Sequence, residues 1–394
     1  MADLTNVIYF DNNATTAVAP EVLEAMLPAF GPLYGNPSSM HSFGGQMGRW
    51  LSTAREQVGQ LIGASPEEVI FTSCGSESDN AAWYSATETQ PEKRHVITTK
   101  VEHSAVLAYA HYLEDKGYEV TWLGVDDKGQ IDLEELERSI RPDTALVSMM
   151  YANNETGTVF PIDKVAQIVK SHGVQLHVDA VQAVGKEVID LKTLPIDYLA
   201  ISGHKLHAPK GIGMLYIRRG VNIANLLDGG GQEKRKRGGT ENLPYIVGLA
   251  KALEIADEKI KDLPRVAKMR DRLIEEITKI PYSKLNGHRT DRLAGNVNIG
   301  FEFIEGESLL LWLDISGICA STGSACSSAS LEASHVLLAM GVPHEKAHGS
   351  LRLSISHETT DEDIDYIIAT VPGVVERLRN MSPLWEDIVK NEKK

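Results

Sequence analysis

The stretch Asp197-Tyr-Leu-Ala-Ile-Ser-Gly-His-Lys-Leu-His-Ala-Pro-Lys-Gly-Ile-Gly-Met214 contains Lys205, on which the predicted fold and site depend. Its apolar run ends at Ser202, and a Gly-His-Lys turn then presents Lys205 just past the carboxyl end of a strand. Open α/β sheets keep their functional sites at that edge. A lysine in a turn is also common on protein surfaces, and the tetrapeptide is short. The role of Lys205 therefore depends on its neighbours.

A second apolar run, Val174-Gln-Leu-His-Val-Asp179, lies upstream and ends in a carboxylate. Parallel pairing of the two strands would bring Asp179 and Lys205 to one edge of the sheet. Such a pair suits pyridoxal phosphate, because the amine forms a Schiff base with the aldehyde and the carboxylate keeps the pyridine nitrogen protonated. The two residues therefore predict a pyridoxal-phosphate site.

Length and composition limit the class of protein. A chain of 394 residues exceeds the size of about 250 to 300 residues at which single cores stop growing, so we expect two domains. The net charge of −15 argues against nucleic acid or an anionic membrane as a partner, and it favours a soluble cytoplasmic protein. No export signal is visible at the N-terminus, and no run approaches the roughly 18 apolar residues of a membrane span. Three cysteines without a Cys-x-x-Cys pair argue against a disulfide framework or structural zinc.

Apolar runs of strand type predict the main sheet. They cover residues 69–72, 95–99, 118–123, 145–151, 174–179, 198–202 and 212–217. Stretches of helical character separate most of them, such as 104–116, 132–140 and 162–172. This alternation predicts an α/β fold with a mainly parallel seven-stranded sheet and flanking helices.

The C-terminal third has a different pattern. A charged helical pattern begins near residue 250, is interrupted at Pro264 and then resumes, which predicts a hinge. Segments 296–299, 306–313 and 350–356 follow, and a helix near 361–378 comes after the capping signal Thr359-Thr-Asp-Glu362. We therefore predict a large domain over residues 16–260, and a smaller α+β domain formed by residues 1–15 and 261–394.

Several short segments are candidates for holding a phosphate. In Thr72-Ser-Cys-Gly-Ser-Glu-Ser-Asp-Asn80, Gly75 and Ser76 would offer backbone N–H groups at a positive helix end, although an ordinary helix cap has the same pattern. Ser202 and His204 flank the lysine and can also hold phosphate. The segment 229–242 is glycine-rich and basic, and because its charge is local in an acidic chain we interpret it as a mobile phosphate-side loop with Thr240 as the contact.

Other polar residues follow strands or alternate with apolar ones. His103 would stack on a pyridine ring and move protons, or be structural. Gln182 follows Asp179 within reach of a ring hydroxyl. Asn154 would bind a substrate carboxylate or a ring oxygen, or merely shape a turn. Arg352 alternates with apolar neighbours, and its guanidinium would clamp a carboxylate or form a structural ion pair.

A segment of small side chains, Ser321-Thr-Gly-Ser-Ala-Cys-Ser-Ser-Ala-Ser330, surrounds one thiol. Such a composition cannot pack a core, so we expect an exposed, mobile loop on which Cys326 is functional. Cys74 and Cys319 are interpreted as packing residues. We predict no metal site, because His204 and His207 have no suitably spaced third ligand.

Taken together, the chain resembles the cysteine desulfurases of the fold-type-I pyridoxal-phosphate enzymes, in the class-V aminotransferase group and its NifS-like, nitrogen-fixation branch. The likeness covers nearly the whole chain. Its segments are Tyr9-Phe-Asp-Asn-Asn-Ala-Thr-Thr16, Gly35-Asn-Pro-Ser-Ser39, Ala152-Asn-Asn-Glu-Thr-Gly-Thr158, Ser202-Gly-His-Lys205, Gly323-Ser-Ala-Cys-Ser-Ser328 and Asn380-Met-Ser-Pro-Leu-Trp385.

The resemblance implies a role for each candidate. Lys205 is implied to be the Schiff-base lysine, and His103 to stack on the cofactor ring. Asp179 is implied to contact the pyridine nitrogen and Gln182 the ring oxygen. The residues implied to bind the phosphate are Gly75, Ser76, Ser202, His204 and Thr240, the last from the second subunit of a homodimer. Asn154 and Arg352 are implied to hold the substrate carboxylate, and Cys326 to take the sulfur. Two departures are visible: Gly75-Ser76 stands where many relatives have Ala-Thr, and His357 where many have arginine.

The activity implied by the resemblance is removal of sulfur from L-cysteine, which leaves L-alanine and a persulfide on the enzyme. The persulfide would pass to an iron–sulfur scaffold protein of NifU-like type. One alternative is another pyridoxal-phosphate enzyme, an aminotransferase or a selenocysteine lyase, which would have no need for a mobile thiol. A second alternative is a catalytically silent binding protein, which would have no need for Lys205, Asp179, Cys326 and Arg352.

Overall fold

The computed structural model describes residues 7–323, 333–383 and 385. The strands are β1 (Ile8–Tyr9), β2 (Val69–Thr72), β3 (His95–Thr99), β4 (Glu119–Leu123), β5 (Thr144–Met150), β6 (Gln175–Asp179), β7 (Tyr198–Ser202), β8 (Gly213–Ile217), β9 (Ser283–Leu285), β10 (Asn296–Phe301), β11 (Ile318–Cys319) and β12 (Ser350–Ser354). The helices are α1 (Pro20–Phe30), α2 (Ser42–Ile62), α3 (Gly75–Glu88), α4 (Ser104–Asp115), α5 (Leu133–Ser139), α6 (Ile162–Ser171), α7 (Leu243–Lys259), α8 (Leu263–Ile277), α9 (Gly306–Ile315), α10 (His335–Ala339), α11 (His344–Ala347) and α12 (Asp361–Asn380).

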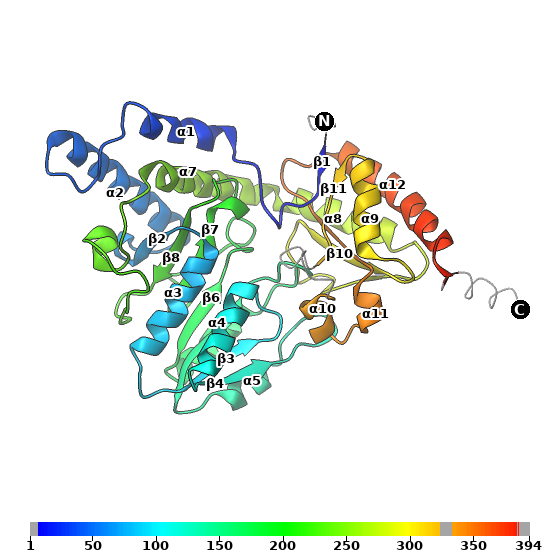
Figure 1. The fold of residues 1–394 in the computed structure, drawn as a ribbon, viewed down its shortest axis with the longest axis horizontal. Coiled ribbons are helices and arrows are strands. Elements are labelled where there is room, and N and C mark those ends of the chain that lie inside the picture. Colours follow the sequence, from blue (N-terminus) through cyan, green and yellow to red (C-terminus); the bar gives the residue numbers. More distant parts are fainter. Residues whose placement is uncertain (1–6, 324–332, 384, 386–394) are drawn as a thin grey trace, which may run out of the picture.

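The main sheet has seven strands in the order β2-β8-β7-β6-β5-β3-β4. Each predicted apolar run forms one of these strands, so the prediction of a seven-stranded sheet is confirmed. The pairs from β7 through β6, β5 and β3 to β4 are parallel, whereas β8 runs antiparallel to both of its neighbours, β7 and β2. The sheet is therefore mainly parallel, and it carries helices on both faces (Figure 1).

The two faces of the sheet are buried by different helices, as the alternation of side chains along a strand requires. In β8, Met214 and Tyr216 belong to one apolar cluster and Leu215 and Ile217 to another. The first cluster includes residues of α1, α2, α6 and α7, and the second includes residues of α3 and α4. Burial on both faces explains why these strands have continuous apolar sequences rather than alternating ones.

A second region of the chain has a separate core. The antiparallel strands β12, β10 and β9 form a small sheet, and β1 pairs in parallel with β11. Helices α8, α9 and α12 pack beside these strands (Figure 1). Phe10, near the N-terminus, is fully buried in the same apolar cluster as Leu273 and Leu353. The domain boundaries at residues 15/16 and 260/261 stay a prediction, and this shared core supports them.

Two local predictions differ from the structure. The helix predicted from about residue 250 begins earlier, at Leu243, and Leu243 and Ile246 in its first turns are buried. Pro264 lies in the first turn of α8, where the missing N–H of proline removes no hydrogen bond of the helix. The cap of α12 is Thr360 rather than Thr359. The Thr360 hydroxyl accepts from the Asp363 N–H, and the Asp363 carboxylate accepts from the Thr360 N–H. Within the described ranges, no helix is both long and apolar enough to span a bilayer.

Candidate active site

A cavity of about 320 Å³ opens where several strands of the main sheet end. It lies beside the carboxyl ends of β6 and β7, the edge at which α/β sheets bind ligands. The residues predicted from the sequence that line it are Gly75, Ser76, His103, Asn154, Asp179, Gln182, Ser202, His204, Lys205 and Arg352. Side chains that are far apart in the sequence thus share one cavity of a size that suits a cofactor with a small substrate.

The lysine and the aspartate are placed by the predicted parallel pairing. Strand β6 ends at Asp179, which lies opposite Ala200 of β7, and Lys205 ends the short turn that follows β7. The Nζ atom of Lys205 donates to the backbone carbonyls of Asn13, at 2.5 Å, and Ala14, at 2.8 Å. The expected approach of Asp179 and Lys205 to one cavity is confirmed.

Buried acids give this cavity an unusual electrostatic character. Burial raises the pKa of Asp179, although the positive charges of His103 and Lys205 oppose the shift. Burial and the nearby charges of Asp179 and Glu102 raise the pKa of Asp79 well above its ordinary value. Burial also raises the pKa of Glu102, which is not among the lining residues, to about 8. Acids held in this way favour a cationic group in the cavity, and a protonated pyridine nitrogen is such a group.

Asp79 has a buried neighbour that the sequence did not reveal. Its Oδ1 lies 3.3 Å from Nε2 of His177, and neither atom has a hydrogen-bond partner among the described residues. His177 Nδ1 contacts the Ser148 hydroxyl at 2.8 Å, and the indole N–H of Trp83 donates to the same hydroxyl. Burial lowers the pKa of His177 to about 3, so this imidazole is neutral at physiological pH. In the sequence, only the spacing of one helical turn from Gly75 indicates that Asp79 lies at the cavity.

The start of helix α3 gives the cavity groups that suit a phosphate. Helix α3 begins at Gly75, so the first N–H groups of the helix, which have no carbonyl partner within it, face the cavity end. A Cβ atom on Gly75 would lie 2.8 Å from a methyl group of Val181, so glycine permits this close approach. Burial, together with the charge of Lys205, lowers the pKa of His204 to about 4, which leaves a neutral imidazole able to donate one N–H.

His103 caps helix α4 and also lines the cavity. Its Nδ1 atom accepts a hydrogen bond from the backbone N–H of Ala105 at 3.2 Å. If the imidazole carries a single proton, this contact places it on Nε2. Gln182, on the turn after Asp179, donates from Nε2 to the Asn13 carbonyl at 2.9 Å.

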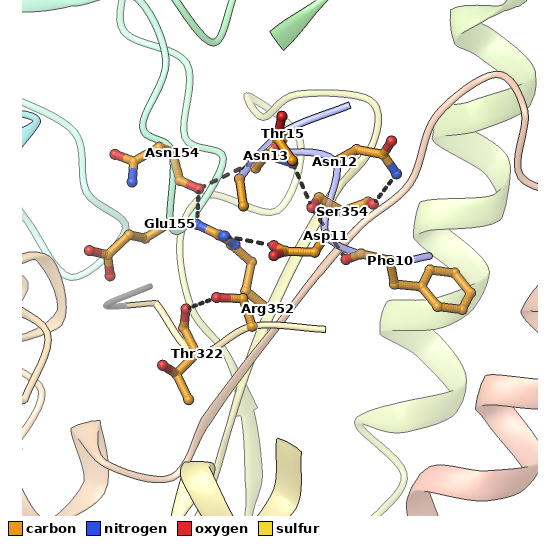
Figure 2. Close-up of polar contacts among 12 residues, drawn as sticks. Phe10, Asp11, Asn12, Asn13, Thr15, Asn154, Glu155, Thr322, Arg352 and Ser354 are labelled. Atoms are coloured by element: carbon orange, nitrogen blue, oxygen red, sulfur yellow. Dashed lines mark hydrogen bonds and ion pairs between the residues drawn. The ribbon is translucent and has the colours of Figure 1, made fainter. Parts of the chain in front are cut away.

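Arg352, in β12, lines the cavity and is ion-paired (Figure 2), so the structural ion pair is confirmed, whereas the clamp for a substrate carboxylate stays a prediction. Its guanidinium donates to the Asp11 carboxylate at 2.9 Å and to the Asn154 carbonyl at 3.1 Å. The side chain is only 3% exposed, and its Nε atom has no hydrogen-bond partner within the described part of the chain. The sequence did not predict Asp11 as the partner of Arg352, although Asp11 belongs to a polar run that directly follows an apolar one.

Some predicted residues are not brought to this cavity. Thr240 is exposed and does not line the cavity of its own chain. Cys326 lies outside the described residues. His357 lines a different, smaller cavity of about 70 Å³, where its ring contacts that of His207. Cys74 lines the main cavity, whereas Cys319 lies in β11.

Comparison with known proteins agrees with this geometry. Residues 8–367 match the family model described as aminotransferase class-V. The chain is 57% identical over 383 residues to "Cysteine desulfurase 2" of Trichormus variabilis, covering 97% of this chain and 96% of that protein. It is 52% identical to "Cysteine desulfurase IscS" of Methanosarcina thermophila, covering 96% and 94%.

Solved structures are similar as well. A "NIFS-LIKE PROTEIN" superposes with a TM-score of 0.90 at 40% identity, covering 95% of this chain and all of that one (100%). A structure titled "SspA in complex with cysteine" has a TM-score of 0.78 at 35% identity, covering 88% and 98%.

The chain belongs to the aminotransferase class-V family, whose members use pyridoxal 5'-phosphate. Within this family it groups with the cysteine desulfurases of NifS/IscS type. The cavity fits that cofactor, because it combines a lysine, a buried carboxylate and the N-terminus of a helix.

Proposed function

We propose that this chain removes sulfur from L-cysteine, leaves L-alanine and a persulfide on Cys326, and supplies that sulfur for iron–sulfur cluster assembly. The observation that carries the proposal is the shared cavity of Lys205, Asp179 and Arg352 in a chain 57% identical to a cysteine desulfurase. A lysine and an acid serve many reactions of this cofactor class, whereas a buried guanidinium beside them suits an amino-acid carboxylate.

The cofactor would be held by several groups that line the cavity. Gly75, Ser76, Ser202 and His204 would bind its phosphate. Asp179 would pair with the pyridine nitrogen, and the buried position of this carboxylate strengthens that pairing. The bound cofactor supplies an electron sink for the substrate carbon next to the amine.

The substrate carboxylate would bind between Arg352 and Asn154. Asp11 and the Asn154 carbonyl hold the guanidinium in place, so little side-chain entropy remains to be lost when the substrate binds. A substrate bound in this way would share the cavity with Lys205.

Two residues would move protons. The Nζ atom of Lys205 would be one carrier. His103 is the other, and it would use Nε2, because the Ala105 N–H engages Nδ1.

Sulfur transfer requires a soft nucleophile. The Cys326 thiolate would bond to the substrate sulfur as the carbon–sulfur bond breaks, and the electron pair of that bond would stay with the carbon that becomes the alanine methyl group. The assignment of Cys326 rests on the sequence, since this residue is outside the described ranges.

Two assembly partners belong to the proposal. A second copy of the chain would bring its own Thr240 to the phosphate side, which agrees with the exposure of Thr240 and its absence from the cavity of its own chain. A NifU-like scaffold protein would accept the sulfur. The cytoplasmic location stays a prediction from composition.

The direct test uses the purified protein. We expect a visible absorbance band from cofactor bound to lysine, and equal amounts of alanine and released sulfide when L-cysteine and a reductant are added. Transfer of the amine from alanine to a keto acid at a comparable rate would favour an aminotransferase instead. A protein without the absorbance band would favour a silent binding protein.

A further inference from the structure

Lys186 is a second lysine close to the reacting one, and no role described so far includes it. It lies in the turn region after β6 and is partly buried. Burial, followed by the positive charges of Lys205 and Arg352, lowers its pKa to about 7. No carboxylate of the described residues forms an ion pair with it. Keeping an amine next to other cations is unfavourable, so a structural or functional benefit is expected.

The hydrogen bonds of Lys186 orient two side-chain amides. Its Nζ atom donates to Oε1 of Gln182 at 3.1 Å and to Oδ1 of Asn13 at 3.4 Å. The two ends of an amide have similar shapes, so the network of donors and acceptors decides which way the amide points. In its protonated form the amine of Lys186 has only donors, so both amides then direct oxygen toward Lys186 and nitrogen away from it.

The outward-facing nitrogens of both amides bind to the active-site framework. Gln182 lines the main cavity, and its Nε2 donates to the backbone carbonyl of Asn13 at 2.9 Å. That same carbonyl accepts from Nζ of Lys205. The Asn13 side-chain nitrogen donates to the Asn154 carbonyl at 3.1 Å, and Arg352 donates to that carbonyl too (Figure 2). Lys186 is thus linked to both the cofactor side and the substrate side.

We propose that Lys186 is a positioning residue that fixes the Gln182 amide with its nitrogen toward the cofactor. Lys186 acts from behind the site, because it lines the smaller cavity and not the main one. The inference rests on the proposed function for the part played by Gln182. With Lys186 in place, Gln182 presents a donor, which stabilises negative charge on a ring oxygen.

The test compares Lys186→Met with Gln182→Leu and with the double variant. Methionine keeps much of the lysine stem and removes the donor. We expect Lys186→Met to weaken cofactor binding about tenfold, the value of one hydrogen bond of ordinary strength, and to shift the visible absorbance maximum. Because Lys186 acts through Gln182, adding Lys186→Met to Gln182→Leu is expected to produce little further change. Lys192→Met is the matched control at an exposed lysine, with binding and spectrum unchanged.

Two results would overturn the proposal. Fully additive effects of the two substitutions would mean that Lys186 acts independently of Gln182. A lower melting temperature with an unchanged spectrum would mean that the residue is merely structural. If Lys186→Met yields little folded protein, Lys186→Gln replaces it, because an amide can present either end and so relaxes the orientation. Cofactor affinity and absorbance are measured without turnover of cysteine, so failure of the proposed reaction would be recognised separately.

Discussion

Replacement of Arg352 by methionine tests the proposed carboxylate site. The guanidinium has five N–H donors. One terminal nitrogen donates to Asp11 and the other to the Asn154 carbonyl, while Nε has no partner in the described ranges. Donors therefore remain for a substrate carboxylate in a cavity where the side chain is 3% exposed. Charge-assisted hydrogen bonds in such surroundings contribute roughly 1.5 to 3 kcal/mol each. We expect a loss of about 2 to 4 kcal/mol, or roughly 30- to 900-fold in kcat/KM for L-cysteine.

The assay pairs L-cysteine with cysteamine, which has the amine and the thiol but no carboxylate. Binding of each is followed by the change in cofactor absorbance, and kcat/KM for L-cysteine by alanine production. We expect Arg352→Met to weaken binding of L-cysteine and to leave binding of cysteamine nearly unchanged. Asp11→Asn is the control, because it removes the ion pair and keeps the guanidinium. Equal losses for both compounds, or no loss for L-cysteine, would refute the carboxylate role.

Two further substitutions test Lys205 and the buried Glu102. Lys205→Ala is expected to abolish the visible absorbance of lysine-bound cofactor, and an unchanged spectrum of the purified variant would exclude Lys205 as the covalent residue. For Glu102, burial raises the pKa from 4.5 to about 8, so between these values the folded protein binds more protons than the unfolded one and stability falls as pH rises. Glu102→Gln is expected to flatten this decline. Urea unfolding at pH 6 and pH 8.5 measures it, and an identical pH dependence in the variant would contradict the assignment.

The main sheet and much of the cavity could be predicted because they follow local patterns. Each strand is an apolar run bounded by turn residues; Asp179 ends one such run, and His103 and Lys205 each come shortly after one. Parallel strands end at a common edge of the sheet, so residues at the ends of different strands could be predicted to lie close together. Cofactor chemistry then connected Lys205 with Asp179.

Contacts between distant segments left no such local signal. Asp11 and Arg352 are separated by 341 residues, and their pairing depends on the N-terminal segment lying beside β12. The pairing of Asp79 with His177 and the contact of Lys186 with Asn13 likewise depend on packing between elements. The capping box at Thr360 was placed one residue early, because adjacent threonines and acids fit the same motif in two registers.

The most direct test of the whole account is the fate of the substrate sulfur in Cys326→Ser. A hydroxyl is almost fully protonated near neutral pH and attacks sulfur poorly, whereas a thiolate is soft and available. The variant is expected to keep the cofactor absorbance and its change on adding L-cysteine, but to form no alanine above background and to show no added sulfur by intact-protein mass. Cys74→Ser and Cys319→Ser are the matched controls and are expected to stay active. Desulfuration at the native rate by Cys326→Ser, or the added sulfur on Cys319, would contradict the account.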